Sequence, residues 1–215
     1  MVNKLGNKPG NKVGNSSMMK LIILDRDGVI NFDSPDFIKS PTEWRPIPGA
    51  LEAIARLNQA GYRVVVASNQ SGIARELFDM ATLNLIHQKM HALAQQQGAS
   101  IDAIFFCPHA AVHDCACRKP KAGMFDEIAQ RYKINLAGVP TVGDSLRDLQ
   151  AGFQAGCAPY LVLTGKGEQT HAAGGLPPGS MVFANLAAMV SHLLAAAPPA
   201  IMTTVAFEAH APVAP

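Results

Sequence analysis

Short apolar runs, each followed by a helical segment, constrain the fold of this chain more than any other feature of its sequence. The first run, Leu21 to Leu24, contains no polar residue and stops abruptly at Asp-Arg-Asp-Gly. Such a run is typical of a strand buried on both faces. Residues 48–60 have helical spacing of apolar side chains and end at Gly61, and a second apolar run follows at residues 64–67.

The same alternation continues along the chain. Further strands are predicted at 101–106, 139–142, 160–163 and 182–183, and further helices at 79–97, 124–132, 148–155 and 186–194. Strands separated by single helices predict an α/β fold of three layers, in which helices cover both faces of a central parallel sheet. In such sheets ligands bind at the carboxyl ends of the strands, so we expect the functional site there.

The length and composition indicate one domain. The chain has 215 residues, and 48% of them are hydrophobic, which suits a single globular domain with a sizeable core. We assign this domain to residues 18–195. Residues 1–17 are rich in Asn, Lys and Gly, so we predict a disordered N-terminal tail. Residues 196–215 are rich in Ala and Pro and are predicted to form a loose C-terminal tail.

The charge and hydropathy exclude two classes of partner. The formal net charge is +2, but Lys4, Lys8 and Lys12 lie in the predicted tail, and the remainder of the chain has a charge of −1. No basic face for nucleic acid is expected. The most apolar late stretch, residues 186–197, is too short to span a membrane. Because no secretory signal is recognisable, we expect a cytoplasmic protein, and we expect a monomer.

Chemically reactive side chains follow directly after the predicted strands. They are Asp25 and Asp27 after the first strand, Ser68 after the second, Lys119 just before a helix expected to begin at Pro120, and Asp144 and Asp148 after the fourth. A single Asp after a strand is most often the N-cap of the next helix. Here that explanation would have to hold at three places at once. Carboxylates that converge on one point repel each other unless a cation lies among them, and oxygen ligands favour Mg²⁺.

This set of side chains predicts phosphoryl transfer from a small phosphorylated metabolite. Asp25 is the expected nucleophile, and Mg²⁺ with Lys119 would neutralise the repulsion between this carboxylate and an anionic phosphate ester. Ser68 can hold a phosphate oxygen. Asp27 is placed to protonate the leaving oxygen and then to take a proton from the attacking water.

The segment Asp25-Arg26-Asp27-Gly28-Val29 resembles the nucleophile motif of the haloacid dehalogenase-like phosphatase superfamily. Ser68, Lys119 and residues 143–148 are similar to the second, third and fourth motifs of that superfamily, in the same order. The resemblance implies a Rossmann-like haloacid dehalogenase fold. The segment between Asp27 and Ser68 is mostly used by one predicted helix, so we expect no large cap domain.

Two shorter segments narrow the resemblance to a family. Residues 68–75 and 117–120 resemble the D-glycero-D-manno-heptose-1,7-bisphosphate 7-phosphatase family. This resemblance implies removal of the 7-phosphate of the heptose bisphosphate in lipopolysaccharide or surface-glycan biosynthesis. The alternative within enzymes is the related histidinol-phosphate phosphatase, from which residues 72–75 are expected to differ.

The resemblance also implies site residues. Mg²⁺ would be held by the side chains of Asp25 and Asp144 and by the backbone carbonyl of Asp27. The implied substrate contacts are Arg26, Asp33, Ser34, Asn69, Gln70, Ser71, Arg118 and Ser145. Ser145 occupies a position where some members of the superfamily have lysine. Residues 31–47 are the expected lid or specificity segment, and Trp44 within it could be a core anchor or a substrate contact.

A cluster of sulfur and nitrogen ligands precedes Lys119. Cys107, His109, Cys115 and Cys117 could form a closed tetrahedral set for structural Zn²⁺ in a loop of residues 107–117. Such a zinc loop occurs in both families, and here it would fix the approach of Arg118 and Lys119. Outside the cluster, Cys157 is expected to be a packed free thiol. We expect the side chains of His87, His91 and His113 to be solvated.

An alternative of another class is a receiver-type signalling module, which also gathers acidic residues, a Ser or Thr and a Lys around Mg²⁺. In a receiver the phosphorylated Asp lies on a middle strand and the Lys comes last. Here the Asp25 motif comes first and Lys119 precedes Asp144, which favours the phosphatase.

Overall fold

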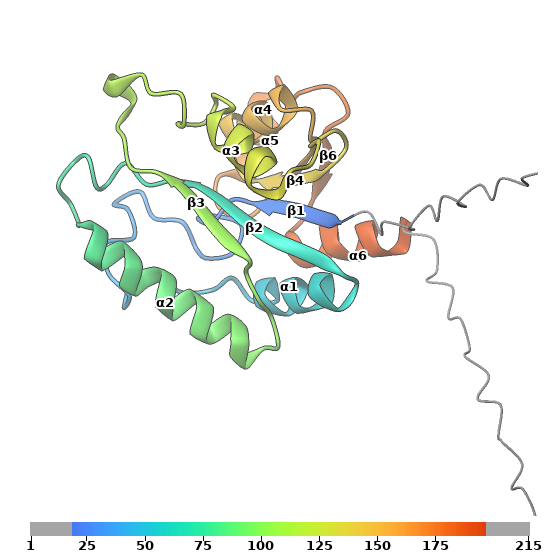
Figure 1. The fold of residues 1–215 in the computed structure, drawn as a ribbon, viewed down its shortest axis with the longest axis horizontal. Coiled ribbons are helices and arrows are strands. Elements are labelled where there is room, and N and C mark those ends of the chain that lie inside the picture. Colours follow the sequence, from blue (N-terminus) through green and yellow to red (C-terminus); the bar gives the residue numbers. More distant parts are fainter. Residues whose placement is uncertain (1–18, 197–215) are drawn as a thin grey trace, which may run out of the picture.

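The computed structural model describes residues 19–196 (Figure 1). The predicted tails at residues 1–17 and 196–215 lie outside this range, except that Ala196 is the last residue of the final helix. Within the described range, no helix is long and apolar enough to cross a membrane.

The centre of the molecule is one parallel sheet of six strands in the order β3-β2-β1-β4-β5-β6 (Figure 1). The strands are β1 (Lys20–Leu24), β2 (Tyr62–Asn69), β3 (Ala103–Cys107), β4 (Pro140–Gly143), β5 (Ala158–Val162) and β6 (Met181–Phe183). Because β1 lies between β2 and β4, the chain reverses its direction of travel across the sheet at β1. This is the position where a ligand crevice forms in open α/β sheets.

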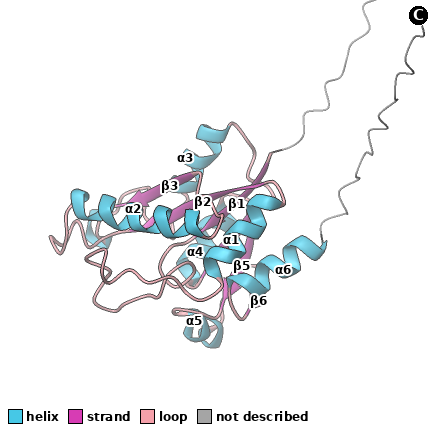
Figure 2. Cartoon of the chain, turned by 90° about the horizontal axis from the view of Figure 1, so that it is seen from below, coloured by secondary structure: helices cyan, strands magenta, loops and turns pink. Residues whose placement is uncertain are grey.

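Five helices connect these strands, a sixth follows β6, and together they form two outer layers. They are α1 (Ala50–Gln59), α2 (Met80–Gln96), α3 (Gly123–Tyr132), α4 (Leu146–Gln154), α5 (Gly167–Ala173) and α6 (Leu186–Ala196). The helices α1, α2 and α6 cover one face, and α3, α4 and α5 cover the other (Figure 1). The first layer faces the viewer in Figure 2. The predicted three-layer fold is therefore confirmed.

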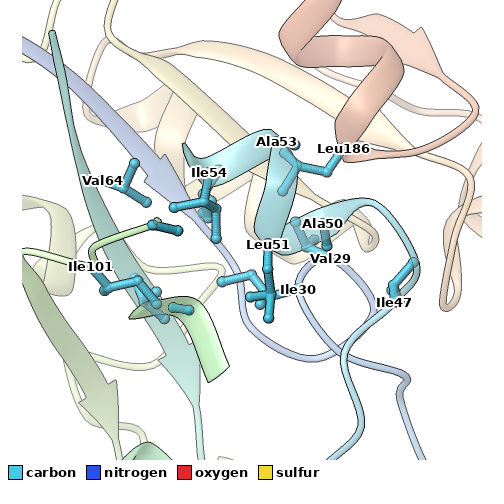
Figure 3. Packing of buried hydrophobic residues seen from close by; sticks show 14 of the residues in the cluster. Val29, Ile30, Ile47, Ala50, Leu51, Ala53, Ile54, Val64, Ile101 and Leu186 are labelled. Atoms are coloured by element: carbon cyan, nitrogen blue, oxygen red, sulfur yellow. The ribbon is translucent and has the colours of Figure 1, made fainter. Parts of the chain in front are cut away.

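The apolar runs of β1 and β2 supply both cores. Ile22 and Leu24 pack with α1, α2 and α6 in one cluster, part of which is drawn in Figure 3. Leu21 and Ile23 pack with α3 and α4 in a second cluster. Because successive side chains of a strand point to opposite faces, an unbroken apolar run is needed where both faces are covered.

Three features of the local structure differ from the sequence-based expectations. The helix predicted at 124–132 begins at Gly123, so Pro120 lies before it and is not its first residue, and the Gly123 N–H donates to the Ala116 carbonyl at 3.2 Å. The short helix α5 was not predicted, because only Gly167 is buried in it and no apolar stripe marks it. A 3₁₀ turn at Ala111–His113 was also not predicted and has no buried residue.

The segment between β1 and α1, residues 25–49, is fixed to the body of the domain. It is anchored by Trp44, which is fully buried in the first core, so this side chain is a core anchor and not a substrate contact. Lys89 of α2 holds the same segment by donating to the carbonyls of Pro41 at 2.6 Å and Trp44 at 2.8 Å. A loop that is fixed in this way can form one wall of a pocket.

Candidate active site

Three carboxylates and one lysine meet at the carboxyl edge of the sheet. Oxygen atoms of Asp25, Asp144 and Asp148 all lie within 4.8 Å of one another. The Lys119 Nζ lies 3.0 Å from Asp25 Oδ1 and 2.7 Å from Asp148 Oδ1. It also donates to the Ala67 carbonyl at 2.7 Å, and its side chain is only 2% exposed. The ammonium group therefore faces the carboxylates and not bulk solvent.

Strand pairing brings two of these carboxylates together. Leu24 at the end of β1 pairs with Val142 of β4, and the Asp25 N–H donates to the Val142 carbonyl at 2.9 Å. Asp25 and Asp144 thus leave neighbouring strands at the same level. Gly28 makes room for Asp144, because a Cβ at position 28 would lie 2.0 Å from Asp144 Oδ2. The local fold therefore depends on a glycine directly after the Asp-Arg-Asp sequence.

The electrostatics of the cluster favour a further cation. Burial first, and then the Asp148 charge, raises the pKa of Asp25 to about 6. Burial, followed by the charges of Asp148 and Asp25, raises the pKa of Asp144 to about 8. Burial opposes ionisation of Lys119, but Asp148 and Asp25 outweigh it, so the pKa of this lysine is raised. The single charge of Lys119 does not balance three carboxylates, so excess negative charge remains. A site of oxygen ligands with this charge suits Mg²⁺.

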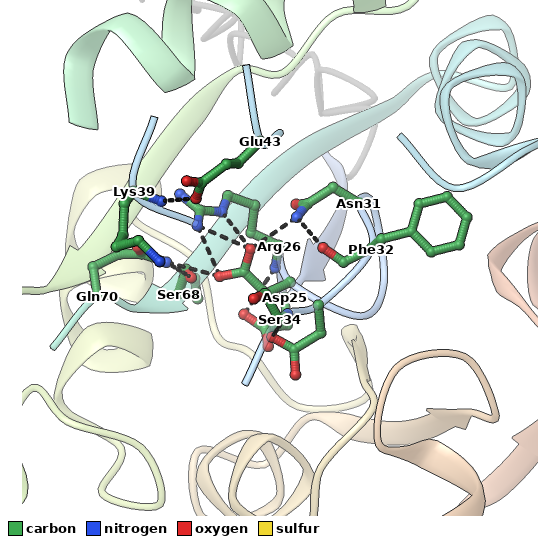
Figure 4. Close-up of polar contacts among 12 residues, drawn as sticks. Asp25, Arg26, Asn31, Phe32, Ser34, Lys39, Glu43, Ser68 and Gln70 are labelled. Atoms are coloured by element: carbon green, nitrogen blue, oxygen red, sulfur yellow. Dashed lines mark hydrogen bonds and ion pairs between the residues drawn. The ribbon is translucent and has the colours of Figure 1, made fainter. Parts of the chain in front are cut away.

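The Asp27 carboxylate is held by several donors, of which Arg26, Asn31 and Gln70 are labelled in Figure 4. Arg26 donates through Nε and Nη2 at 2.8–3.0 Å, and Asn31 Nδ2 donates at 2.9 Å. Gln70 Nε2 donates to Asp27 at 3.1 Å and to the Ser68 hydroxyl oxygen at 2.7 Å. Burial alone would raise the pKa of Asp27, but Arg26 and the hydrogen bonds outweigh it and lower the pKa. The structure therefore holds Asp27 as a carboxylate and links it to Ser68.

These groups open into a cavity of about 260 Å³. Its lining includes all four predicted catalytic residues, Asp25, Asp27, Ser68 and Lys119, together with Asp144 and Asp148. Six of the eight predicted substrate contacts also line it: Asp33, Ser34, Asn69, Gln70, Ser71 and Arg118. The structure thus brings most of the predicted site together in one pocket.

Two predicted substrate contacts, Arg26 and Ser145, do not line the pocket. Arg26 is fully buried, and its guanidinium group is turned toward Asp27. Ser145 is also buried, and both its N–H and its hydroxyl group donate to Asp148 Oδ2. The assignment of both residues as substrate contacts is corrected, because each orients a carboxylate of the site.

Asn69 lines the pocket but also has a structural partner. Its side-chain amide donates to the Lys119 carbonyl at 3.1 Å, and its side-chain oxygen accepts from the Lys119 N–H at 3.1 Å. This pair of hydrogen bonds ties the end of β2 to the loop that carries Lys119. Asn69 therefore fixes the backbone on which the buried ammonium group depends.

Several residues of the pocket were not among the predicted contacts. They are Pro35, Phe37, Ile38, Arg75, Arg147 and Lys166. Arg75 and Arg147 lie inside the segments that resemble family motifs, so their positions were visible in the sequence but carried no assigned role. Lys166 follows β5 in a Thr-Gly-Lys-Gly turn. Its N–H donates to Asp144 Oδ2 at 2.8 Å, and its Nζ lies 2.7 Å from Asp33 Oδ2.

The second cluster of possible metal ligands lies beside the pocket. The sulfur atoms of Cys107, Cys115 and Cys117 are separated by 3.2–3.5 Å. The His109 Nδ1 lies 3.4 Å from the Cys117 sulfur and 3.7 Å from the Cys107 sulfur. Tetrahedral Zn²⁺ with Zn–S bonds of about 2.3 Å requires sulfur atoms about 3.8 Å apart. The four ligand atoms are thus close to the spacing that one zinc ion needs.

This cluster is connected directly to the active site. Cys117 is separated from Lys119 only by Arg118, whose Nη1 donates to the His109 carbonyl at 3.1 Å. The position of both basic residues thus depends on the geometry of the Cys/His loop. Unlike these ligands, Cys157 is packed in the second core at 4% exposure, as predicted for an isolated thiol.

One of the histidines expected to be solvated is buried. His87 of α2 is 8% exposed, and its ring packs edge-on against Phe106 with a centroid distance of 6.1 Å. Burial, followed by the charge of Arg26, lowers the pKa of His87 to about 4. The expectation was wrong because β3 and the interior of the molecule cover this turn of α2. His91 is partly exposed and His113 is exposed, so the latter agrees with its expected solvation.

Comparisons with known proteins agree with this geometry. A family model described as HAD-hydrolase-like matches residues 116–189, and one described as polynucleotide kinase 3 phosphatase matches residues 20–147. The D-glycero-beta-D-manno-heptose-1,7-bisphosphate 7-phosphatase of Bordetella bronchiseptica is 63% identical over 176 residues, covering 82% of this chain and 98% of that protein. The Pseudomonas putida protein of the same name is 51% identical over 176 residues, covering 82% and 100%.

Solved structures give the same result. The B. bronchiseptica D,D-heptose 1,7-bisphosphate phosphatase, crystallised with magnesium and phosphate, has a TM-score of 0.82 at 62% identity, covering 83% of this chain and 100% of that chain. The corresponding phosphatase from Burkholderia thailandensis has a TM-score of 0.67 at 55% identity, covering 81% and 98%.

The fold, the carboxylate–lysine centre and these matches define a phosphatase of the HAD-like superfamily. Within that superfamily, the chain belongs to the D-glycero-beta-D-manno-heptose-1,7-bisphosphate 7-phosphatase family. The resemblance inferred from the sequence motifs is thereby confirmed.

Proposed function

We propose that this chain is a Mg²⁺-dependent phosphomonoesterase that removes the 7-phosphate of D-glycero-β-D-manno-heptose 1,7-bisphosphate through a phosphoaspartate on Asp25. The observation that carries the proposal is the meeting of three carboxylates with the buried ammonium group of Lys119 in a chain of this family. The relatives are named for the β anomer, and we adopt that anomer as the preferred substrate.

The residues present fit a magnesium ion. We propose that the side chains of Asp25 and Asp144 and the backbone carbonyl of Asp27 hold it. The mutual repulsion that raises the pKa values of Asp25 and Asp144 is relieved by a cation among the oxygen atoms. When bound, Mg²⁺ supplies positive charge against which the phosphate oxygens and the Asp25 carboxylate can approach each other.

In the first step, Asp25 attacks phosphorus, a bond forms between its carboxylate oxygen and the phosphoryl group, and the bond from phosphorus to the sugar oxygen breaks. Lys119 lies 3.0 Å from Asp25 and is positioned to stabilise the negative charge on the transferring oxygens. Ser68, near the end of β2, lines the same pocket and supplies a hydroxyl group. The attacking carboxylate is ionised above the pKa of about 6 that burial gives Asp25.

Asp27 donates a proton in the first step and accepts one in the second. The donors around it favour the carboxylate, which is the form needed to take a proton from the water that cleaves the phosphoaspartate. In the first step Asp27 must instead deliver a proton to the sugar oxygen. The anionic phosphate raises the pKa of a neighbouring carboxyl group, so substrate binding itself favours the protonated form.

We also propose a structural zinc ion at Cys107, His109, Cys115 and Cys117. The sulfur and nitrogen spacings support this assignment, because three sulfur atoms and one imidazole nitrogen at these distances suit the tetrahedral ligand set that Zn²⁺ prefers. The ion would hold the loop in which Arg118 contacts the His109 carbonyl, and through it the approach of Lys119 to the pocket.

The setting of the reaction follows from the substrate. We propose that the chain works in the cytoplasm as a monomer and supplies a heptose monophosphate for the activated heptose of lipopolysaccharide or another surface glycan.

The test is a comparison of turnover on four substrates with Mg²⁺: the β and α anomers of the heptose 1,7-bisphosphate, histidinol phosphate, and an oligonucleotide 3′-phosphate. We expect the highest kcat/KM for the β anomer and no turnover by an Asp25→Asn preparation on any of them. A higher kcat/KM for histidinol phosphate or the oligonucleotide would overturn the proposed substrate. Undiminished turnover by Asp25→Asn would overturn the mechanism.

A further inference from the structure

The pocket has more positive charge than the reacting phosphate needs. In addition to Lys119, four basic side chains line it: Arg75, Arg118, Arg147 and Lys166. Lys119 is buried between Asp25 and Asp148 and belongs to the reaction centre. The other four surround the space that the remainder of the substrate would occupy.

Three of these four side chains already have partners in the protein. Arg118 donates to the His109 carbonyl, Lys166 pairs with Asp33 at 2.7 Å, and Arg75 lies over the Phe37 ring at 5.9 Å. Arg118 and Lys166 thus have polar partners, whereas Arg75 is exposed and has only the Phe37 ring beside it.

Arg147 is different. Among residues 19–196, no hydrogen bond or ion pair joins its guanidinium group to another residue, although the residue is half-buried and lines the cavity. A guanidinium group has five N–H donors and stays charged at any physiological pH, so a half-buried one without a partner is a strong candidate to bind an anion.

The position of Arg147 relative to the reaction centre is fixed by the fold. It lies in the first turn of α4, directly before Asp148, and Asp148 is paired at 2.7 Å with Lys119, the neighbour of Arg118. Both arginines line the same pocket as the reaction centre, Arg147 from the first turn of α4 and Arg118 from the end of the Cys/His loop. An anionic group of the substrate beside the reaction centre would lie in the space that both side chains line.

We propose that Arg147 is a specificity-determining residue that binds the phosphate group that is not hydrolysed, so that the pocket selects a bisphosphorylated sugar over its monophosphate. This inference rests on the proposed function and assigns the second anionic subsite of the same pocket. A guanidinium group is matched to phosphate because two parallel N–H donors can meet two phosphate oxygens.

The experiment measures kcat and KM of Arg147→Gln, Arg147→Lys and a control, Arg131→Gln, on the heptose 1,7-bisphosphate and on the heptose 7-phosphate. Arg131 is exposed on α3 and does not line the pocket. Loss of a charge-assisted hydrogen-bonding partner predicts that Arg147→Gln lowers kcat/KM for the bisphosphate about 10- to 100-fold, mainly through KM. In Arg147→Gln, the ratio of kcat/KM for the bisphosphate to kcat/KM for the 7-phosphate should fall toward one. The ratio should be intermediate in Arg147→Lys and equal to the wild-type ratio in Arg131→Gln.

An equal loss on both substrates overturns the inference, because it would mean that Arg147 acts through Asp148 and not through the second phosphate. A selectivity of Arg147→Gln equal to that of the wild type overturns it as well. Failure of the wild-type enzyme to hydrolyse the bisphosphate is a different result, which overturns the proposed function and the inference together.

Discussion

Replacing Lys119 by methionine tests the electrostatics of the site. The Lys119 ammonium group lies 3.0 Å from Asp25 and 2.7 Å from Asp148, donates to the Ala67 carbonyl, and is 2% exposed. Lys119→Met keeps most of the side-chain volume but leaves two buried carboxylates without their shared cation. Removing one partner of a buried ion pair costs about 3–5 kcal/mol. For a domain of this size, the melting temperature falls by roughly 6–20 °C.

The unfolding free energy that Lys119→Met loses depends on pH and increases as pH rises. In the wild type, burial would raise the pKa of Asp148, but Lys119 outweighs burial and lowers it. Without the lysine, the pKa of Asp148 rises above that of the unfolded chain, and the pKa of Asp25, which is already raised, rises further. A carboxyl group with a raised pKa in the folded state loses stabilising free energy as pH rises toward that pKa. The deficit of Lys119→Met is therefore larger at pH 8 than at pH 5.

The assay is urea unfolding at both pH values in magnesium-free buffer. Lys121→Met is the matched control, because Lys121 is 47% exposed and pairs with Asp114, which is 87% exposed. This surface pair is worth about 0–1 kcal/mol at either pH. A deficit for Lys119→Met below about 1 kcal/mol, or one that is equal at pH 5 and pH 8, would refute the reasoning.

Three further predictions concern the metals and the backbone around them. Because burial and neighbouring charges raise the pKa of Asp144 to about 8, the magnesium-free protein should lose up to about 3 kcal/mol of unfolding free energy between pH 5.5 and pH 8. Addition of Mg²⁺ at pH 8 should restore it, and a flat pH profile in urea unfolding would contradict this. Gly28→Ala should lower kcat at least about tenfold and weaken Mg²⁺ activation, because its Cβ would lie 2.0 Å from Asp144 Oδ2. The control is Gly61→Ala. Gly61 has the same φ of +83° as Gly28 but open space around it, so the activity of this variant should equal that of the wild type. Cys117→Ser should lower both the melting temperature and the zinc content, the latter measured by atomic spectroscopy. The control Cys157→Ser should retain its zinc. Full zinc content in Cys117→Ser would exclude Cys117 as a ligand.

The fold was predictable because the strands of a sheet covered on both faces have an unmistakable pattern. The runs at 21–24 and 64–67 have apolar side chains at every position, and the structure places alternate ones in the two cores. The helix α5 was not predictable in this way, because it buries only Gly167 and its position depends on the β5–β6 connection. Local composition therefore identifies helices and strands that bury an apolar face, and it misses elements that bury little apolar surface.

The reactive centre was predictable from the ends of the strands, but the directions of individual side chains were not. Asp25 and Asp27 were recognisable from spacing, whereas the sequence does not reveal that Arg26 between them is fully buried against Asp27. Ser145 likewise turns inward to Asp148 because α4 begins there. Such orientations depend on which neighbouring element fills the space, and that information is spread over the whole chain.

The rim of the pocket was the least predictable part. Lys166 and Asp33 are far apart in the sequence, and their contact joins the β5–α5 connection to the segment after β1. Phe37, in the same segment as Asp33, meets Arg75 from the β2–α2 connection. Pairings between loops follow from the packing of the whole domain and leave no local pattern in the sequence.

The most direct test of the mechanism is to trap the phosphoryl group on the enzyme. The Asp27→Asn variant, mixed with Mg²⁺ and 4-nitrophenyl phosphate, should form the phosphoaspartate because nitrophenolate leaves without a proton donor, but should hydrolyse it slowly because the base is gone. Acid quenching and peptide mass spectrometry should then locate one phosphoryl group on Asp25. A phosphoryl group on another residue, or release of nitrophenolate with no labelled peptide, would contradict the account.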